Sequence, residues 1–350
     1  MKRLFWNPEE HRLAMLWRVL LQYGLFFLAM IILQALVGIA GGILLMASGG
    51  LSAEAATAPD FAMEFARKLQ AMPVFTVLIT LASLLAVFAA TWVAGRVFDR
   101  RKFADFGFRF SGLWWSDFAF GLFLGAILMV FIFLVEWLLG WVDITGQMVA
   151  VQAGASLAVG LMVAAVRFIC VGIYEELLSR GYMLRNLGEG FKNLGISPKL
   201  AILIGYFLSS IVFGLLHAGN PNATLISTIN LMVAGLFLGL GYILTGELGI
   251  PIGLHITWNF FQGNVFGFPV SGMASNASLI NISQGGPNIW TGGAFGPEAG
   301  LIGLIAIALG GIMTVLYVRW RHGKVAVCEE VALYTPRVKK TIQTGPVETI

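Results

Sequence analysis

Eight apolar stretches divide the chain, and each is about long enough to cross a lipid bilayer as a helix. A hydrocarbon core of ~30 Å needs about 20 apolar residues per helix, and a spanning segment must satisfy its own backbone groups. The pattern therefore predicts an all-α, polytopic membrane protein with about eight transmembrane helices. The stretches cover residues 16–47, 73–95, 117–140, 157–179, 199–217, 225–244, 251–267 and 299–318.

The segments between these stretches suggest four regions. Residues 1–156 would hold the first three transmembrane helices with their loops, and residues 157–267 a helical core. Residues 268–320 would hold a long outer loop and the last helix, because 268–298 is rich in Gly, Ser, Asn and Pro and nearly free of charge. Residues 321–350 are expected to be a polar, partly disordered cytoplasmic tail.

Composition supports the membrane assignment. Hydrophobic residues make up 58% of the chain and charged residues 11%, against about 25% charged in soluble domains. This excludes a water-soluble enzyme. The net charge is +4, but the basic residues lie between apolar stretches, so we expect no nucleic-acid partner.

The basic residues also predict an orientation. All but three of the 22 Lys and Arg lie on alternate connections, with Arg180 and Arg185 assigned to the one after the fourth stretch. Under the positive-inside rule this places both termini in the cytoplasm of a plasma (inner) membrane. Of the three exceptions, only Arg167 lies inside an apolar stretch, and we expect it either at the outer interface or paired with Glu136.

Ionisable groups inside apolar helices are costly, so each is a candidate for function. Two adjacent glutamates, Glu175 and Glu176, stand near the end of the fourth stretch. Glu176 and Arg180 are four residues apart, with the acid first, which favours an ion pair along one helix face. Glu175 points ~100° away from that face and is left for a proton, a metal or a water.

Two of the four histidines, His217 and His255, belong to apolar stretches, and Asn259 follows His255 by one helical turn. Two histidines and a glutamate match catalytic zinc sites that keep one position for water, so Glu175, His217 and His255 would bind Zn²⁺. In a metal-free alternative, Glu175 and His217 activate water while His255 and Asn259 stabilise the oxyanion. The sequence leaves both versions open.

Three ordered motifs carry a family resemblance. EELLSRG at 175–181, FGLLH at 213–217 and HITWN at 255–259 resemble the motifs of the CPBP intramembrane proteases. That family includes the type II CAAX prenyl endopeptidases and the Abi-type bacteriocin self-immunity proteins. The resemblance implies a catalytic set of Glu175, Glu176, His217, His255 and Asn259, supported by Arg180 and Phe213.

The resemblance also implies a function. We expect an intramembrane endopeptidase that cuts a peptide or protein substrate near the cytoplasmic face, among membrane lipids, including a substrate lipidated at a C-terminal Cys. Two other classes stay open: a proton-coupled transporter, because Glu and His chains also relay protons, and a non-catalytic immunity or scaffold protein.

The sequence offers two placements of the site in the membrane. Hydropathy places Glu175 and His255 near the cytoplasmic side, whereas His217 lies 18 residues past Lys199, ~27 Å along a helix. Either the fifth span is displaced, so that the polar turn 218–222 enters a cavity, or the fourth span begins later, near Arg167.

Overall fold

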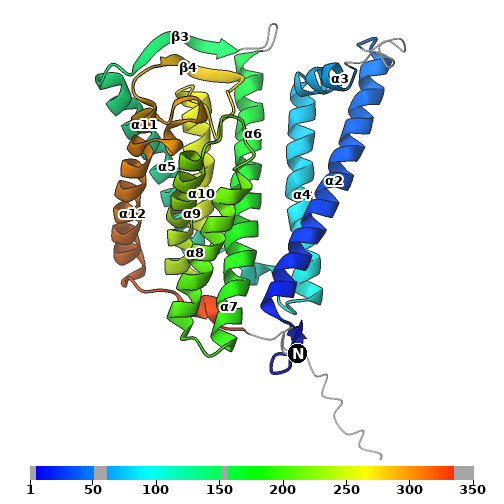
Figure 1. The fold of residues 1–350 in the computed structure, drawn as a ribbon, viewed down its shortest axis with the longest axis vertical. Helices are drawn as coiled ribbons and strands as arrows, with labels where there is room; N and C mark the ends of the chain where they lie inside the picture. The colour runs from blue at the N-terminus through cyan, green and yellow to red at the C-terminus, as the bar shows by residue number, and fades with distance from the viewer. Residues whose placement is uncertain (1–4, 51–60, 151–155, 335–350) are drawn as a thin grey trace, which may run out of the picture.

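The fold is a bundle of long, roughly parallel helices (Figure 1). The structure, a computed structural model, describes residues 5–50, 61–150 and 156–334. Seven helices in these ranges are long and apolar enough to cross a membrane, which confirms the all-α polytopic prediction. They are α2 (Met15–Ala47), α4 (Pro73–Val97), α5 (Gly112–Leu138), α6 (Leu157–Glu176) with its continuation to Asn193, α8 (Pro198–Leu216), α9 (Leu225–Thr245) and α12 (Leu301–His322).

The stretch at 251–267 forms a shorter helix than the others. Helix α10 covers Gly249–Phe260 and continues as a π-helical turn, η4 (Phe261–Val265). Every residue from Gly249 to Ile256 is buried. This segment is therefore enclosed by neighbouring helices, and its apolar composition reflects burial in protein.

The fourth stretch extends well beyond its predicted end at residue 179. Helix α6 passes into a π-helical segment, η3 (Leu177–Leu184), and then into α7 (Arg185–Asn193). Arg180 and Arg185, which we assigned to a cytoplasmic connection, are buried inside this continuous helix. The placement in a connection between helices was wrong, and both guanidiniums have partners in the protein: Arg180 pairs with Glu176, and Arg185 donates to the Tyr242 hydroxyl.

The expected outer loop contains regular structure. Strand β4 (Ala277–Gln284) pairs antiparallel with β3 (Val142–Ala150) at the end of the bundle opposite α7 (Figure 1). Short helical turns follow: α11 (Asn288–Thr291), η5 (Gly293–Phe295) and η6 (Pro297–Ala299). Glu136 accepts a hydrogen bond from Gln284 at 2.7 Å and makes no ion pair with Arg167, so the expected Arg167–Glu136 pair is wrong.

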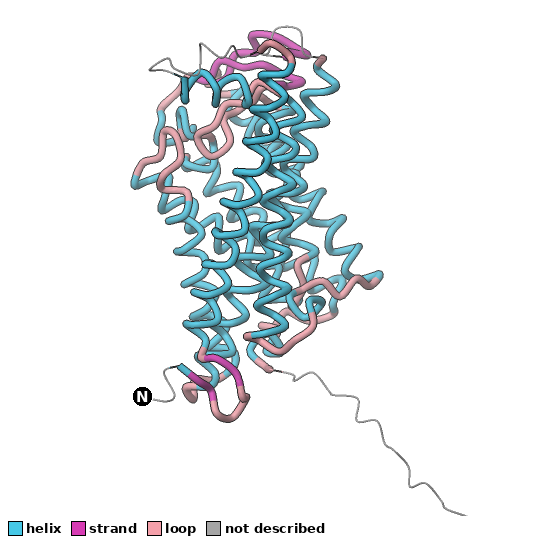
Figure 2. Tube along the Cα trace, turned by 90° about the vertical axis from the view of Figure 1, so that its right-hand side faces the viewer, coloured by secondary structure: helices cyan, strands magenta, loops and turns pink. Residues whose placement is uncertain are grey.

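Smaller elements cover the end of the bundle that holds α7, where Figure 2 also shows strands. These are β1 (Trp6–Asn7), β2 (Arg12–Leu13), η2 (Phe103–Phe106) and η7 (Glu329–Ala332), while α3 (Phe61–Gln70) lies between α2 and α4 in the chain. The start of the predicted tail is packed, not disordered: Cys328 N donates to Ile243 O at 2.8 Å and Val331 is buried. Residues 335–350 lie outside the described residues.

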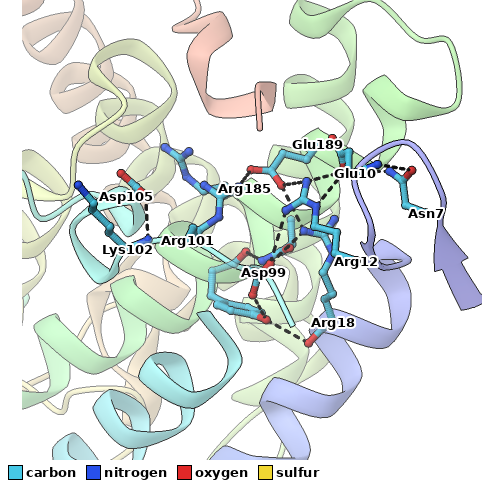
Figure 3. Close-up of polar contacts among 12 residues, drawn as sticks. Asn7, Glu10, Arg12, Arg18, Asp99, Arg101, Lys102, Asp105, Arg185 and Glu189 are labelled. Atoms are coloured by element: carbon cyan, nitrogen blue, oxygen red, sulfur yellow. Dashed lines mark hydrogen bonds and ion pairs between the residues drawn. The ribbon is translucent and has the colours of Figure 1, made fainter. Parts of the chain in front are cut away.

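A buried ion cluster joins α2 and α4 to α7 (Figure 3). Glu189 on α7 pairs with Arg12 at 2.7 Å, with Arg18 at 3.2 Å and with Arg101. Asp99, just after α4, pairs with Arg18 at 2.9 Å. Because these charges are almost fully removed from solvent, each depends on the others for compensation.

Small residues let α10 lie directly against α5. A methyl group added to Gly121 would stand 2.8 Å from Leu254 N, and one added to Gly125 would stand 2.6 Å from Trp258 N. Such contacts allow close backbone approach in membrane helices. The pair Gly121 and Gly125 thus sets the position of α10, and with it that of His255.

We expect Gly125→Ala to destabilise the protein, because the new methyl group meets backbone atoms of α10 that cannot move independently. Overpacking of this kind costs about 1–3 kcal/mol. Gly38→Ala is the control, since Gly38 in α2 has open space around it and alanine favours helix. Thermal unfolding in detergent should show a lower Tm for Gly125→Ala alone, and equal Tm values for both variants would contradict this packing.

Glu189→Gln should cost about 3–5 kcal/mol, because it leaves three buried guanidiniums short of their shared carboxylate. Glu64→Gln removes one exposed ion pair with Lys68 and should leave the Tm unchanged. Urea or thermal unfolding of the two variants provides the comparison. A wild-type Tm for Glu189→Gln would show that the cluster does not hold α2 and α4 in place.

Candidate active site

The structure brings Glu175, His217 and His255 together from three helices. His217 Nε2 and His255 Nε2 each lie 3.8 Å from Glu175 Oε2. Glu175 is on α6, His217 immediately follows α8, and His255 is on α10. Their side chains are 18%, 17% and 7% exposed, so this polar group lies mostly inside the bundle.

Glu176 belongs to a second, fully buried network behind this group. Its Oε1 accepts hydrogen bonds from Arg180 at 2.9 Å and from His255 Nδ1 at 2.8 Å. Arg180 also donates to Gly235 O at 2.7 Å and lies over the Phe213 ring. The expected Glu176–Arg180 pair is therefore present, and it holds the His255 ring in orientation.

The imidazoles of His217 and His255 are both fixed through Nδ1. His255 Nδ1 faces the Glu176 carboxylate, and His217 Nδ1 lies 2.8 Å from Phe213 O. A carboxylate paired with arginine and a carbonyl oxygen are both acceptors, so each Nδ1 carries hydrogen and donates. Each Nε2 is left to face Glu175.

Only one of the two carboxylate oxygens of Glu175 has a hydrogen-bond partner. Tyr174 donates from its hydroxyl to Glu175 Oε1 at 3.3 Å. Oε2 is buried and has no hydrogen-bond partner. At 3.8 Å neither histidine is within hydrogen-bonding distance of Oε2, but a water oxygen about 2.8 Å from Oε2 and from one Nε2 fits this spacing.

A cavity of about 430 Å³ opens onto these atoms, within the size range of ligand pockets. Its walls come from the helices that carry Glu175, His217 and His255 and also from α2 and α4, through residues such as Phe26, Met30 and Ser83. Most of the lining is apolar. Such a cavity suits an extended, largely apolar ligand with one polar group to be processed.

The remaining predicted residues lie at the same place. Asn259, one turn after His255, lines the cavity. The Phe213 ring lies 4.8 Å from the His217 ring and 4.5 Å from the Arg180 guanidinium. Phe213 thus separates the ion pair from the cavity, while the part played by Asn259 stays a prediction.

The continuous helix explains the depth of the site. Because the helix runs from Leu157 to Asn193, Glu175 stands at its midpoint and not near its end. The helix begins at Leu157, and the alternative that its membrane-spanning part starts later, near Arg167, stays a prediction. Asn220 of the polar turn lines the cavity, as the other alternative expects, and donates to Ser271 O at 3.1 Å.

Sequence reasoning missed several residues of this cavity. Glu298 lines it from η6 and accepts hydrogen bonds from Gln262 and from Ser271 N. Burial raises the pKa of Glu298 to about 7, against the lowering effect of these hydrogen bonds. Its only sequence signal is a single acid at the end of a loop that is otherwise nearly uncharged.

The predicted zinc site is not formed as such. In the described ranges, no group of three His, Cys, Asp or Glu side chains is arranged to hold a metal ion. Donors of one tetrahedral Zn²⁺, each at ~2.0–2.1 Å, stand closer together than 3.8 Å. The donor types suit zinc, the spacing is wider than between two ligands of one bound ion, and zinc binding stays a prediction.

Comparison with known proteins gives one match. A search of curated proteins and a search of solved structures found nothing similar to the chain. A family model described as type II CAAX prenyl endopeptidase, Rce1-like, matches residues 157–261, less than a third of the chain. The matched segment contains Glu175, His217 and His255, so this part of the chain is similar to the Rce1-like type II CAAX prenyl endopeptidases.

Proposed function

We propose that the protein is an intramembrane endopeptidase that hydrolyses a peptide bond with a water activated by Glu175. The observation that carries this proposal is the buried, unpartnered Glu175 Oε2, which faces two imidazole Nε2 atoms inside a cavity. The family match supports the same reaction class.

In the proposed reaction, the water lies between Glu175 Oε2 and His217 Nε2. Its oxygen attacks the carbonyl carbon of the scissile bond while Glu175 takes one of its protons. The carbonyl oxygen becomes an oxyanion. When the carbon–nitrogen bond breaks, Glu175 passes the proton to the leaving amine, which yields a carboxylic acid and a free amine.

His255 and Asn259 are proposed to stabilise the oxyanion. Glu176 accepts from His255 Nδ1 and so holds the ring with Nε2 directed towards Glu175 and the cavity. Donors fixed in a dry site stabilise developing charge strongly, because they need not reorganise. Arg180 acts as a positioning residue, since it holds Glu176 and not the substrate.

The proposed substrate is a peptide or protein drawn from the membrane, including one lipidated at a C-terminal Cys. The cavity wall formed by α2 is apolar, through Phe26, Phe27 and Met30, as a lipid chain requires. We further propose a plasma membrane location with both termini in the cytoplasm. Three arginines pair with Glu189 close to the N-terminal strands. Basic residues gather on the cytoplasmic side of membrane proteins, so this cluster supports a cytoplasmic N-terminus.

Zinc bound by Glu175, His217 and His255 is the alternative version of the same proposal. Its support is that both Nδ1 atoms are held by acceptors, as in ligating histidines, which leaves both Nε2 atoms directed at one carboxylate. Zinc there would polarise the carbonyl and make a bound water more acidic.

The two adjacent glutamates should differ sharply when each is changed to Gln. Glu175→Gln removes the proposed base but no ion pair with arginine, so turnover should fall by at least ~10²-fold with an unchanged Tm. Glu176→Gln should lower both Tm and turnover, because Arg180 loses its buried partner. Purified variants, a quenched peptide library and thermal unfolding test this. Full activity of Glu175→Gln would sink the proposed mechanism.

Chelation separates the two versions of the site. If Glu175 and the histidines act as they stand, 1,10-phenanthroline should leave turnover within about twofold of the untreated rate, because no step passes through a metal. A non-chelating phenanthroline isomer is the control. Loss of activity that added Zn²⁺ restores would instead establish the zinc version.

A further inference from the structure

The cavity extends from Glu175 towards one end of the bundle only. Helix α6 runs from the end that holds β3 and β4 to the end that holds α7 (Figure 1). The loops and turns that line the cavity belong to the β3–β4 end and contribute His217, Asn220, Val270, Ser271, Met273 and Glu298. Met273 is also exposed, so the cavity opens at this end. Among the described residues, none of the lining comes from α7, β1, β2 or η7.

The protein is closed between Glu175 and the α7 end. Every residue of the continuous helix from Glu176 to Asn186 is buried. The Tyr182 hydroxyl donates to Asp99 at 2.5 Å, and the cluster around Glu189 lies beyond it. A hydrated peptide that approached from this end would have to separate buried charges, which is strongly unfavourable.

The charge distribution identifies the β3–β4 end as the outer one. The connecting segments at this end contain no Lys or Arg in residues 139–150, 217–224 and 266–300. The α7 end holds the three arginines that pair with Glu189. Arg67 and Lys68 of α3 are exceptions at the outer end, and Lys68 pairs with Glu64. Under the positive-inside rule the β3–β4 end therefore faces away from the cytoplasm.

Two charged groups of the cavity are not used by the proposed mechanism, and both lie on the β3–β4 side of Glu175. Arg167 lies 3.5 Å from the Met273 thioether, and Glu298 accepts a hydrogen bond from Gln262. In the described ranges, neither group has an opposite charge within 4 Å. Charged groups at membrane depth usually face a water-filled cavity or a partner. These two therefore indicate that water enters the cavity from the β3–β4 end.

We propose that the substrate reaches Glu175 from the outer side of the membrane, through the β3–β4 end. The inference rests on the proposed function and names the side on which that function acts. It differs from the cytoplasmic face that the sequence predicted. The substrate class is then a polypeptide segment that has already crossed the membrane, in an exported protein or in an outer segment of a membrane protein.

The two parts of the cavity suit such a substrate. At the opening, Glu298 accepts from Ser271 N, and Asn220 donates to Ser271 O at 3.1 Å, so the loop that carries Ser271 is held from two sides. These polar groups can contact a hydrated peptide backbone. Phe27 and Met30 of α2 form an apolar wall, and Phe27 is exposed on the side of the bundle. An apolar side chain or a lipid chain of the substrate would lie there.

Vesicles of known orientation test the side of entry. A quenched peptide with charged, membrane-impermeant ends is added to right-side-out and to inside-out membrane vesicles that contain the protein. Only the right-side-out vesicles should cleave it, and both kinds should cleave it equally after detergent opens them. Vesicles with Glu175→Gln give the background rate. Equal cleavage by intact vesicles of both kinds, or faster cleavage by the inside-out ones, would overturn the proposal.

Cysteine labelling tests the same path without activity. In a background with Cys170→Ala and Cys328→Ala, Val171→Cys places a thiol in the cavity wall, one turn before Glu175. A membrane-impermeant thiol reagent should label it from the outer side only. Ser197→Cys, exposed in the connection between α7 and α8, is the matched control and should be labelled only from the inner side.

The outcomes separate this inference from the proposed function. If neither vesicle preparation cleaves the peptide even in detergent, the proposed function fails, and labelling of Val171→Cys still decides the side of entry. Labelling of Val171→Cys from the inner side, or from neither side, overturns the proposal. Labelling of Ser197→Cys from the outer side would mean that the protein is inserted the other way, which also overturns it.

Discussion

A charge inside this bundle must find its partner within the protein, and the buried Arg180 guanidinium shows how far that constraint reaches. It binds Glu176 on its own helix, Gly235 O on α9 and the ring of Phe213 on α8. Glu176 in turn holds His255 on α10. One buried cation therefore connects four helices. Water could not supply these bonds here, so the arrangement of the helices and the satisfaction of this charge depend on each other.

The same constraint explains why two adjacent glutamates differ. Successive helical residues point ~100° apart, so only Glu176 can share the face of Arg180. Glu175 turns towards the cavity, where its Oε2 meets no donor from the protein. An uncompensated buried acceptor is costly to maintain. Its retention opposite two histidines is best explained by a ligand, and a reacting water is the simplest one.

Much of the fold followed from local pattern, because a membrane-spanning helix satisfies its own backbone and needs only an apolar stretch. The convergence of Glu175, His217 and His255 was foreseen from the cost of polar groups in lipid. Arg180 and Arg185 were misplaced because hydropathy counts charge but cannot see a partner such as Tyr242. The pairing of β3 with β4 joins segments far apart in the chain, and no local pattern encodes it. Glu298 was missed for the same reason.

Helices α2 and α4 lie outside the segment that matches the family, yet they form part of the cavity wall. They are also tied to α7 through Glu189 and its arginines, so their position relative to α6 is fixed at one end of the bundle. The proposed catalytic residues lie in residues 157–261, while part of the cavity lining comes from elsewhere in the chain. Substitutions on α2 and α4 can therefore reshape the cavity, and so change which substrate fits, without disturbing the buried network of Glu176, Arg180 and His255.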